Sequence, residues 1–248
     1  MNIVDRTLLA LLGILWGLTP LQAQPLNVGV AANFAPTLEI IAKRYTVETG
    51  QEIKVSVAST GTLYAQILYG APYDLFLAAD RTRPRKLEQQ GMTEARFTYA
   101  FGRLALWAPD SDKPVDESWL KTWRGRLAIA NPGLAPYGAA ALEVMERLDA
   151  QPKQLIKGNN VAQAFGFIDS GNVPAGFVSF SQLRQLRGDR KTSTNDYWLV
   201  PDTYHSPVEQ QAVVIKNAHK SAHEFAAFLR SPPVRGIIET GGYDLARQ

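Results

Sequence analysis

Four short turns hold the residues whose types and spacing could do chemistry. Each turn follows a stretch typical of a strand and precedes one typical of a helix: Ala31-Ala32-Asn33, Ala58-Ser59-Thr60-Gly61, Pro136-Tyr137-Gly138 and Asn159-Asn160-Val161. None of them contains Lys, Arg or His. The first amides of a helix lack partners within the helix and carry about half a positive charge, so several helix starts aimed at one point can bind an anion. The turns therefore predict an anion site made of neutral donors, which suits reversible capture.

Each turn taken alone has a simpler interpretation, which is helix capping. Asn33, Ser59 and Thr60 are residue types that commonly accept a hydrogen bond from the first amides of their own helix. One such turn would not indicate a binding site. Several turns meeting at one point would, and that depends on the elements that position them.

Strands and helices alternate along the chain. Pro36 suits a first helical turn, and Gly50 suits the left-handed residue that ends a helix. Asp80 and Thr82 are candidate caps for the helix that follows them. The alternation predicts an α/β fold with mainly parallel sheets. Strands are expected at 26–30, 53–57, 75–78, 104–108, 127–130, 175–178 and 211–215, and helices at 36–49, 63–69, 84–90, 139–148, 161–169 and 221–229.

The length of 248 residues accommodates two α/β lobes. The chain is expected to cross to the second lobe near Phe101 and to return near Pro201. Lobe one would then comprise residues 24–101 plus 202–248, and lobe two residues 102–201. Ligands of open α/β sheets bind beyond the carboxyl ends of the strands, where the polar turns lie, so we expect a ligand cleft between the lobes.

The first 23 residues are typical of an export signal. Arg6 ends a short charged start, Leu8 to Leu18 is apolar, and residues 19–23 form a cleavage region with the cut expected after Ala23. The apolar run is shorter than the roughly 20 residues that span a bilayer. The chain has no cysteine, which excludes disulfides, a Cys nucleophile and a lipid anchor on cysteine. We therefore expect a periplasmic protein.

Other features of the sequence favour no enzyme or nucleic-acid function. The formal charge of +3 is dispersed along the chain, which gives little of the field that nucleic-acid binding needs. His219 and His223 have the spacing of two metal ligands but no third ligand motif, and the helically spaced Trp119 and Trp123 are expected to pack. The common motifs for hydrolysis and phosphoryl transfer are absent.

Two other classes of protein stay open from the residues alone. The first is a secreted α/β hydrolase that would use a carboxylate such as Asp74 or Asp80. The second is the ligand-sensing domain of a transcription regulator, which would carry a helix-turn-helix segment and remain in the cytoplasm. The predicted export signal argues against the regulator.

The segment from Ala58 to Ile67 reads ASTGTLYAQI, and residues 70–76 read GAPYDLF. With these motifs the chain resembles the periplasmic molybdate-binding proteins of ABC transporters, which are type II periplasmic binding proteins, over residues 26 to 243. The resemblance implies a two-lobed carrier without catalytic activity or cofactor. It also implies molybdate or tungstate as the cargo, a membrane permease as the partner, and a monomer.

The resemblance also implies which residues hold the anion, through its oxygens and without direct ligands to the metal. Lobe one would contribute Asn33 and Thr60, beside Ser59. Lobe two would contribute the backbone amides of Tyr137 and Val161 and a hydroxyl from Ser179. Many members of the family have Ser, a small residue and Tyr where this chain has Asn33, Tyr137 and Ser179. A binding protein for sulfate or phosphate therefore stays open as the alternative.

Overall fold

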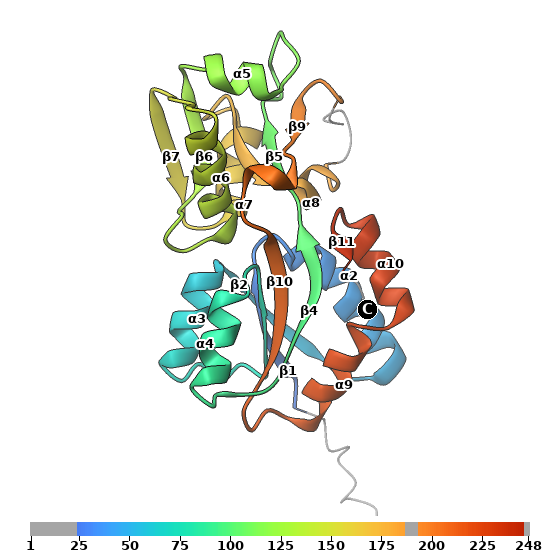
Figure 1. Cartoon of the computed structure of the whole chain (residues 1–248). Helices are drawn as coiled ribbons and strands as arrows, with labels where there is room; N and C mark the ends of the chain where they lie inside the picture. Colours follow the sequence, from blue (N-terminus) through green and yellow to red (C-terminus); the bar gives the residue numbers. More distant parts are fainter. Residues whose placement is uncertain (1–23, 187–192, 246–248) are drawn as a thin grey trace, which may run out of the picture.

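The structure is a computed structural model that describes residues 24–186 and 193–245. It contains two β-sheets, each with helices on its faces, stacked one above the other (Figure 1). The export signal predicted for residues 1–23 and its cleavage site lie outside the described residues. No helix in the described part of the chain is long and apolar enough to cross a membrane.

The first sheet has six strands in the order β11-β4-β10-β3-β1-β2. Its side chains alternate between two hydrophobic clusters. Leu75 and Leu77 pack against α2, α9 and α10, whereas Phe76 and Ala78 pack against α3 and α4. The elements are β1 (Leu26–Ala31), α2 (Ala35–Thr49), β2 (Ile53–Ala58), α3 (Thr60–Leu68), β3 (Leu75–Ala78), α4 (Thr82–Gln89), β4 (Thr93–Gly102), β10 (Val208–Ile215), α9 (Lys220–Phe228), α10 (Pro232–Thr240) and β11 (Asp244–Leu245).

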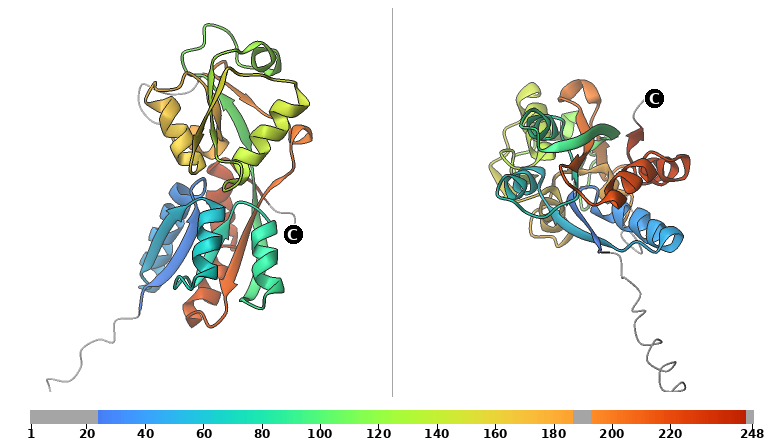
Figure 2. Two further views of the ribbon diagram at one scale, coloured as in Figure 1. Left: turned by 90° about the vertical axis from the view of Figure 1, so that its left-hand side faces the viewer. Right: turned by 90° about the horizontal axis from the view of Figure 1, so that it is seen from below.

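The second sheet has five strands in the order β7-β6-β8-β5-β9. Helix α6 covers one of its faces through Tyr137 and Val144, and α7 covers the other through Ala164 and Ile168. Figure 2 shows the two helices on opposite sides of the sheet. The elements are β5 (Leu104–Trp107), α5 (Glu117–Thr122), β6 (Arg126–Ala130), α6 (Pro136–Arg147), β7 (Gln154–Gly158), α7 (Val161–Asp169), β8 (Gly176–Ser179), α8 (Phe180–Leu183), β9 (Tyr197–Leu199) and the 3₁₀ turn η2 (Asp202–Tyr204).

The expectation of mainly parallel sheets is wrong, because both sheets are mixed. Strands β2 and β3 run parallel to β1, and β7 and β8 run parallel to β6. Strand β10 is antiparallel to β3 and β4, and β5 is antiparallel to β8 and β9. The antiparallel strands β4, β5, β9 and β10 flank the two segments in which the chain passes between the sheets. A strand that enters from the other sheet needs no crossover helix, so its direction is not constrained to be parallel.

The sequence predicted the longer elements well and missed those without a clear apolar pattern. Helix α7 and strand β3 have the predicted bounds, and Gly50 is left-handed with φ of 74°. Helix α3 begins three residues earlier than expected, because Ser59 caps it. Asp80 accepts a hydrogen bond from the backbone amide of Arg83 as predicted, but Thr82 lies inside α4 and is not a cap. The missed elements are β4, β7, β9, β11, α5, α8 and α10.

Candidate functional site

The predicted site residues lie at two sheet edges that face each other. In the first sheet, the parallel strands β1 and β2 end just before Asn33 and Ser59. In the second sheet, the parallel strands β6, β7 and β8 lead toward Tyr137, Val161 and Ser179. All the candidate residues are at most 3% exposed. The edges touch, because the Ser181 hydroxyl donates to the backbone carbonyl of Asn33 at 3.2 Å.

Asn33 lies at the centre of a buried polar network. Its side-chain amide donates to Gln210 Oε1 at 2.8 Å and to the Tyr243 hydroxyl at 3.2 Å. Its carbonyl accepts from the Tyr243 hydroxyl at 2.6 Å. Gln210 comes from β10 and Tyr243 precedes β11, so strands distant in sequence hold this turn. Burial raises the pKa of Tyr243 well above its usual value, so the hydroxyl stays neutral.

Ser179 and Val161 are joined through Gln182. The Ser179 hydroxyl donates to Gln182 Oε1 at 2.9 Å, and the Gln182 side chain donates to the Val161 carbonyl at 3.3 Å. Ser179 Oγ also lies 2.9 Å from Ser181 Oγ, which extends the network to Asn33. Because a hydroxyl has one proton, Ser179 uses its proton on Gln182 in this arrangement.

Tyr137 approaches the same network from α6. Its hydroxyl is buried and has no hydrogen-bond partner among the described residues. Burial raises the pKa of Tyr137 well above its usual value, and the nearby Tyr243 and Tyr99 hydroxyls add to the shift. The smallest effect on this pKa is the opposing one of the nearby Asn33 amide, whose two protons go to Gln210 and Tyr243 and not to Tyr137. Gly102 makes room for this side chain, because a Cβ at Gly102 would lie 2.1 Å from the Tyr137 hydroxyl.

Ser59 and Thr60 occupy the first turn of α3 with different partners. Ser59 Oγ accepts from the backbone amide of Thr62 at 3.2 Å, so this residue does cap its helix. Thr60 Oγ1 accepts from the backbone amide of Ala79 at 3.0 Å. That bond uses a lone pair and leaves the Thr60 proton available as a donor. The next amide, of Gly61, donates across the interface to the Leu134 carbonyl at 2.8 Å.

The structure therefore links Asn33, Ser179 and Val161 through hydrogen bonds of Ser181 and Gln182, whereas Ser59 and Thr60 bond Thr62 and Ala79 outside this network. It also adds residues that the sequence did not single out. Gln210, Tyr243, Ser181 and Gln182 hold the network, and Tyr99 has a second buried hydroxyl without a partner among the described residues. No motif marks these residues in the sequence. Gln210 and Tyr243 reach the site only through the folding of distant segments, whereas Ser181 and Gln182 lie within three residues of the candidate Ser179.

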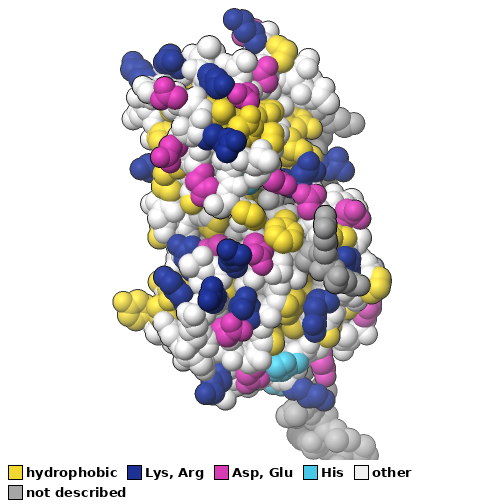
Figure 3. Space-filling model, viewed as in Figure 1, with side chains coloured by type: hydrophobic (Ala, Val, Ile, Leu, Met, Phe, Trp, Pro, Cys, Tyr) yellow, Lys and Arg dark blue, Asp and Glu magenta, His cyan; other side chains and the backbone are white. Residues whose placement is uncertain are grey.

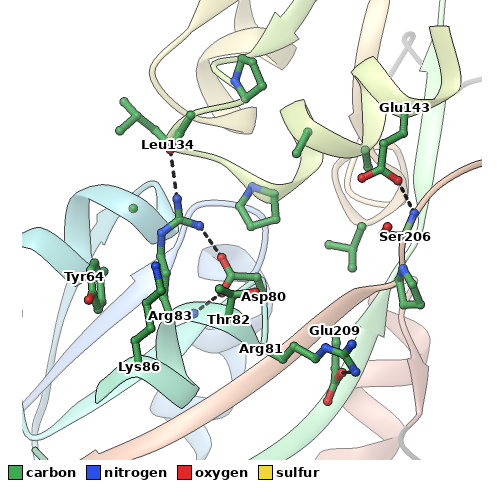
Figure 4. A pocket seen from close by; sticks show the side chains of 18 residues that line it. Tyr64, Asp80, Arg81, Thr82, Arg83, Lys86, Leu134, Glu143, Ser206 and Glu209 are labelled. Atoms are coloured by element: carbon green, nitrogen blue, oxygen red, sulfur yellow. Dashed lines mark hydrogen bonds and ion pairs between the residues drawn. The ribbon is translucent and has the colours of Figure 1, made fainter. Parts of the chain in front are cut away.

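A cleft of about 680 Å³ opens beside this network (Figure 4). Its walls come from both halves of the molecule, including Gly61 and Pro136, which adjoin candidate residues. Its charged lining is balanced, with Arg81, Arg83 and Lys86 against Asp80, Glu143 and Glu209. Basic and acidic side chains are also interspersed over the face seen in Figure 3. The six candidate residues are not in the lining of the cleft, and all of them are buried.

The residues behind the alternative functions have structural partners. Asp74 accepts hydrogen bonds from the backbone amides of Asn27 and His219, and Asp80 pairs with Arg83. His223 Nε2 lies 2.7 Å from Glu94 Oε2. No group of three or more potential metal ligands occurs within residues 24–186 and 193–245. Trp119 and Trp123 stack at 4.5 Å and pack on a hydrophobic cluster, as expected.

The chain matches the family described as bacterial extracellular solute-binding protein over residues 26–244. It belongs to that family. The molybdate-binding protein ModA of Azotobacter vinelandii is 38% identical over 90% of this chain and 91% of that protein. The ModA of Rhodobacter capsulatus is 37% identical over 94% of this chain and 93% of that protein.

A solved structure gives the same result for the fold. The periplasmic molybdate-binding protein of Azotobacter vinelandii matches with a TM-score of 0.79 and 35% identity, over 90% of this chain and all of that one. The family resemblance noted in the sequence is thereby confirmed, as is the two-lobed periplasmic binding protein fold, apart from the mixed sheets. The protein is a solute-binding component of a transporter and not an enzyme, because its relatives are solute-binding proteins.

Proposed function

We propose that this protein captures molybdate, and also tungstate, in the periplasm and delivers it to the permease of an ABC transporter. Two relatives that match at least nine-tenths of the chain are molybdate-binding proteins, which supports molybdate as the cargo. The observation that carries the proposal is that uncharged donors lie at helix starts in both halves of the molecule, and that these halves are joined beside them by the bonds from Ser181 to Asn33 and from Gly61 to Leu134.

In this proposal each half supplies donors to a tetrahedral anion. From the first half, the Thr60 hydroxyl contributes, with Ser59 forming the start of its helix. Asn33 contributes by exchanging one of its two side-chain amide bonds, to Gln210 or Tyr243, for the anion. From the second half, the backbone amides of Tyr137 and Val161 contribute at the starts of α6 and α7. Fixed amides orient an anion without the strong charge pairing of an arginine, so the anion can be released to a permease.

We assign Ser179 a supporting role. Its hydroxyl proton goes to Gln182, and Gln182 in turn holds the Val161 carbonyl. The residue would therefore set the position of the α7 start and touch the anion only if the hydrogen bond to Gln182 is exchanged. Ser179→Ala should weaken binding less than Thr60→Ala does.

The proposal also covers the organisation of the chain. Residues 24–101 plus 202–248 would move as lobe one and residues 102–201 as lobe two, with the monomer closing around the anion. Export would follow cleavage after Ala23, which N-terminal sequencing of the secreted protein tests. Closure would create the surface that the permease recognises.

A calorimetric titration with four anions tests the proposed function. Molybdate and tungstate should bind, and sulfate and phosphate should bind at least about a hundredfold more weakly. Donors spaced for the larger tetrahedron leave buried groups unpaired around a smaller one, at about 1–3 kcal/mol for each group. Preferential binding of sulfate or phosphate would instead assign the site to that anion, and no binding of any of the four would reject an oxyanion carrier.

A further inference from the structure

The loop between β6 and α6 offers two backbone carbonyls to the opposite half of the molecule. Leu134 O accepts from the backbone amide of Gly61 at 2.8 Å, at the start of α3. Gly133 O accepts from the Arg83 guanidinium at 3.0 Å, at the start of α4 (Figure 4). Neighbouring residues of one loop therefore bind two different helices across the cleft.

Arg83 is itself held in place for this contact. Asp80 Oδ2 lies 2.5 Å from Arg83 Nη1, and Asp80 Oδ1 accepts from the Arg83 backbone amide at 2.8 Å. The Arg83 side chain is only 22% exposed. A charged donor that is partly desolvated and fixed by a second bond binds a carbonyl more strongly than a free surface side chain does.

The loop that Arg83 contacts is held by internal hydrogen bonds and leads directly into α6, whose first amides belong to the proposed anion site. Gly133 donates its backbone amide to Asn131 Oδ1 at 3.1 Å, and Ala135 donates to the Asn131 carbonyl at 2.8 Å. Pro136 and Tyr137 follow at once as the first residues of α6. A displacement of the loop would therefore move the Tyr137 amide.

The interface leaves no space for a side chain at Gly61. A Cβ there would lie 2.9 Å from Leu134 O and 3.1 Å from Arg83 Nη2. The contact of Gly61 with the Leu134 carbonyl thus depends on a close approach of backbone to backbone, next to Thr60 and beside the Arg83 side chain.

We propose that Arg83 is a positioning residue for anion binding: through Gly133 O it holds the β6–α6 loop against the first half of the molecule and so keeps the α6 amides at the anion. The inference rests on the proposed function, because it concerns the same site. Arg83 does not contact the anion in this proposal, but it lengthens the time for which the anion stays bound.

The test compares Arg83→Ala and Arg83→Lys with Arg85→Ala, which removes the same charge from an exposed position on the same helix. Arg83→Ala should raise the molybdate Kd roughly tenfold, through faster dissociation, since a hydrogen bond to a charged group is lost. Arg83→Lys should recover part of the affinity, because one ammonium replaces the two-armed guanidinium. Arg85→Ala should stay within about twofold of the wild type. Thermal melts without the anion check that each variant folds.

A distance measurement provides the readout that a purely structural role would not move. The chain has no cysteine, so spin labels can be attached to a single added pair, Tyr69→Cys at the end of α3 and Lys157→Cys in β7. With molybdate added to the same fractional saturation of each variant, Arg83→Ala should lower the fraction of molecules with the short distance between labels, and Arg85→Ala should not.

Equal Kd values and equal distance distributions for Arg83→Ala and Arg85→Ala would overturn the inference. An equal loss of molybdate affinity in Arg83→Ala and Arg85→Ala through slower association would also overturn the inference. That result would indicate that the positive charges only attract the anion over a distance. If the wild type binds none of the anions, the proposed function fails. The distances in the anion-free protein then still decide the role of Arg83, since an unchanged distribution in Arg83→Ala rejects it.

Discussion

Two buried tyrosine hydroxyls near Asn33 should respond in opposite ways to the same chemical change. Tyr243→Phe removes a hydroxyl that bonds the Asn33 carbonyl at 2.6 Å and accepts from its side-chain amide at 3.2 Å. Tyr137→Phe removes a hydroxyl that is buried without a partner among the described residues. Each substitution removes one oxygen and leaves the ring, so packing is nearly constant.

The expected free energies follow from the partners. Loss of the Tyr243 hydroxyl leaves buried groups of Asn33 less well paired, which lowers the free energy of unfolding by about 1–3 kcal/mol. Loss of the Tyr137 hydroxyl removes a desolvated polar group, which raises the free energy of unfolding of the anion-free protein by about 1 kcal/mol. The two variants should therefore differ by about 2–4 kcal/mol, which corresponds to melting temperatures roughly 4–16 °C apart in a protein of this size.

Thermal or urea unfolding of the anion-free proteins, followed by molybdate titration of both, is the assay. Tyr137→Phe should keep its affinity within about twofold, because the proposed contact is the backbone amide. A Tyr137→Phe variant that is less stable than the wild type would refute the interpretation of its hydroxyl as unpaired. A loss of affinity in Tyr137→Phe without a loss of stability would transfer the anion contact from the amide to the hydroxyl.

Three further perturbations have definite expected outcomes. Thr60→Ala should weaken molybdate binding by about 1–3 kcal/mol in calorimetry, and Thr60→Ser, which keeps the hydroxyl, should bind nearly as well as the wild type. Gly102→Ala should lower the free energy of unfolding by about 1–3 kcal/mol in urea, since its Cβ would lie 2.1 Å from the Tyr137 hydroxyl. The backbone amide of Asn217, and then His223, lower the pKa of Glu94. The stability that Glu94 contributes is therefore complete above its ordinary pKa and is lost as the pH falls through the lowered value, so Glu94→Gln and the wild type should converge in melts at acidic pH and differ at neutral pH.

The sequence predicted the strands and helices with strong local signals. Pro36 and Gly50 mark the two ends of α2, and Val161–Asp169 has the bounds that its apolar spacing predicts. Strand β4 was missed because most of its residues are only partly buried, so they show no clear alternation of apolar and polar residues. Strands β9 and β11 are too short for a pattern, with three and two residues.

The candidate site was predictable in part for a similar reason. Helix starts with Ser, Thr and Asn are visible in sequence, and Asn33, Thr60 and Val161 all lie at such starts. Ser59 shows the limit of the approach, because it caps its own helix as the simpler interpretation requires. Gln210 and Tyr243 lie 177 and 210 residues from Asn33 along the chain, so no local pattern could connect them to it.

The sequence by itself determined the class of protein, the α/β elements with strong local signals and the neutral character of the candidate anion-binding turns, because these depend on residue types and on spacings within one turn or one helix. The direction of β10, the network around Asn33 and the contacts of Arg83 and Gly61 with the β6–α6 loop were decided by the tertiary structure alone. They arise where segments distant in sequence pack against each other, within a sheet or between the two sheets, and local propensities do not determine which distant segments meet. These tertiary contacts decide whether a side chain in a turn is used within the protein or is available to a ligand. A hydroxyl has one proton, and the neighbouring acceptors determine where that proton goes.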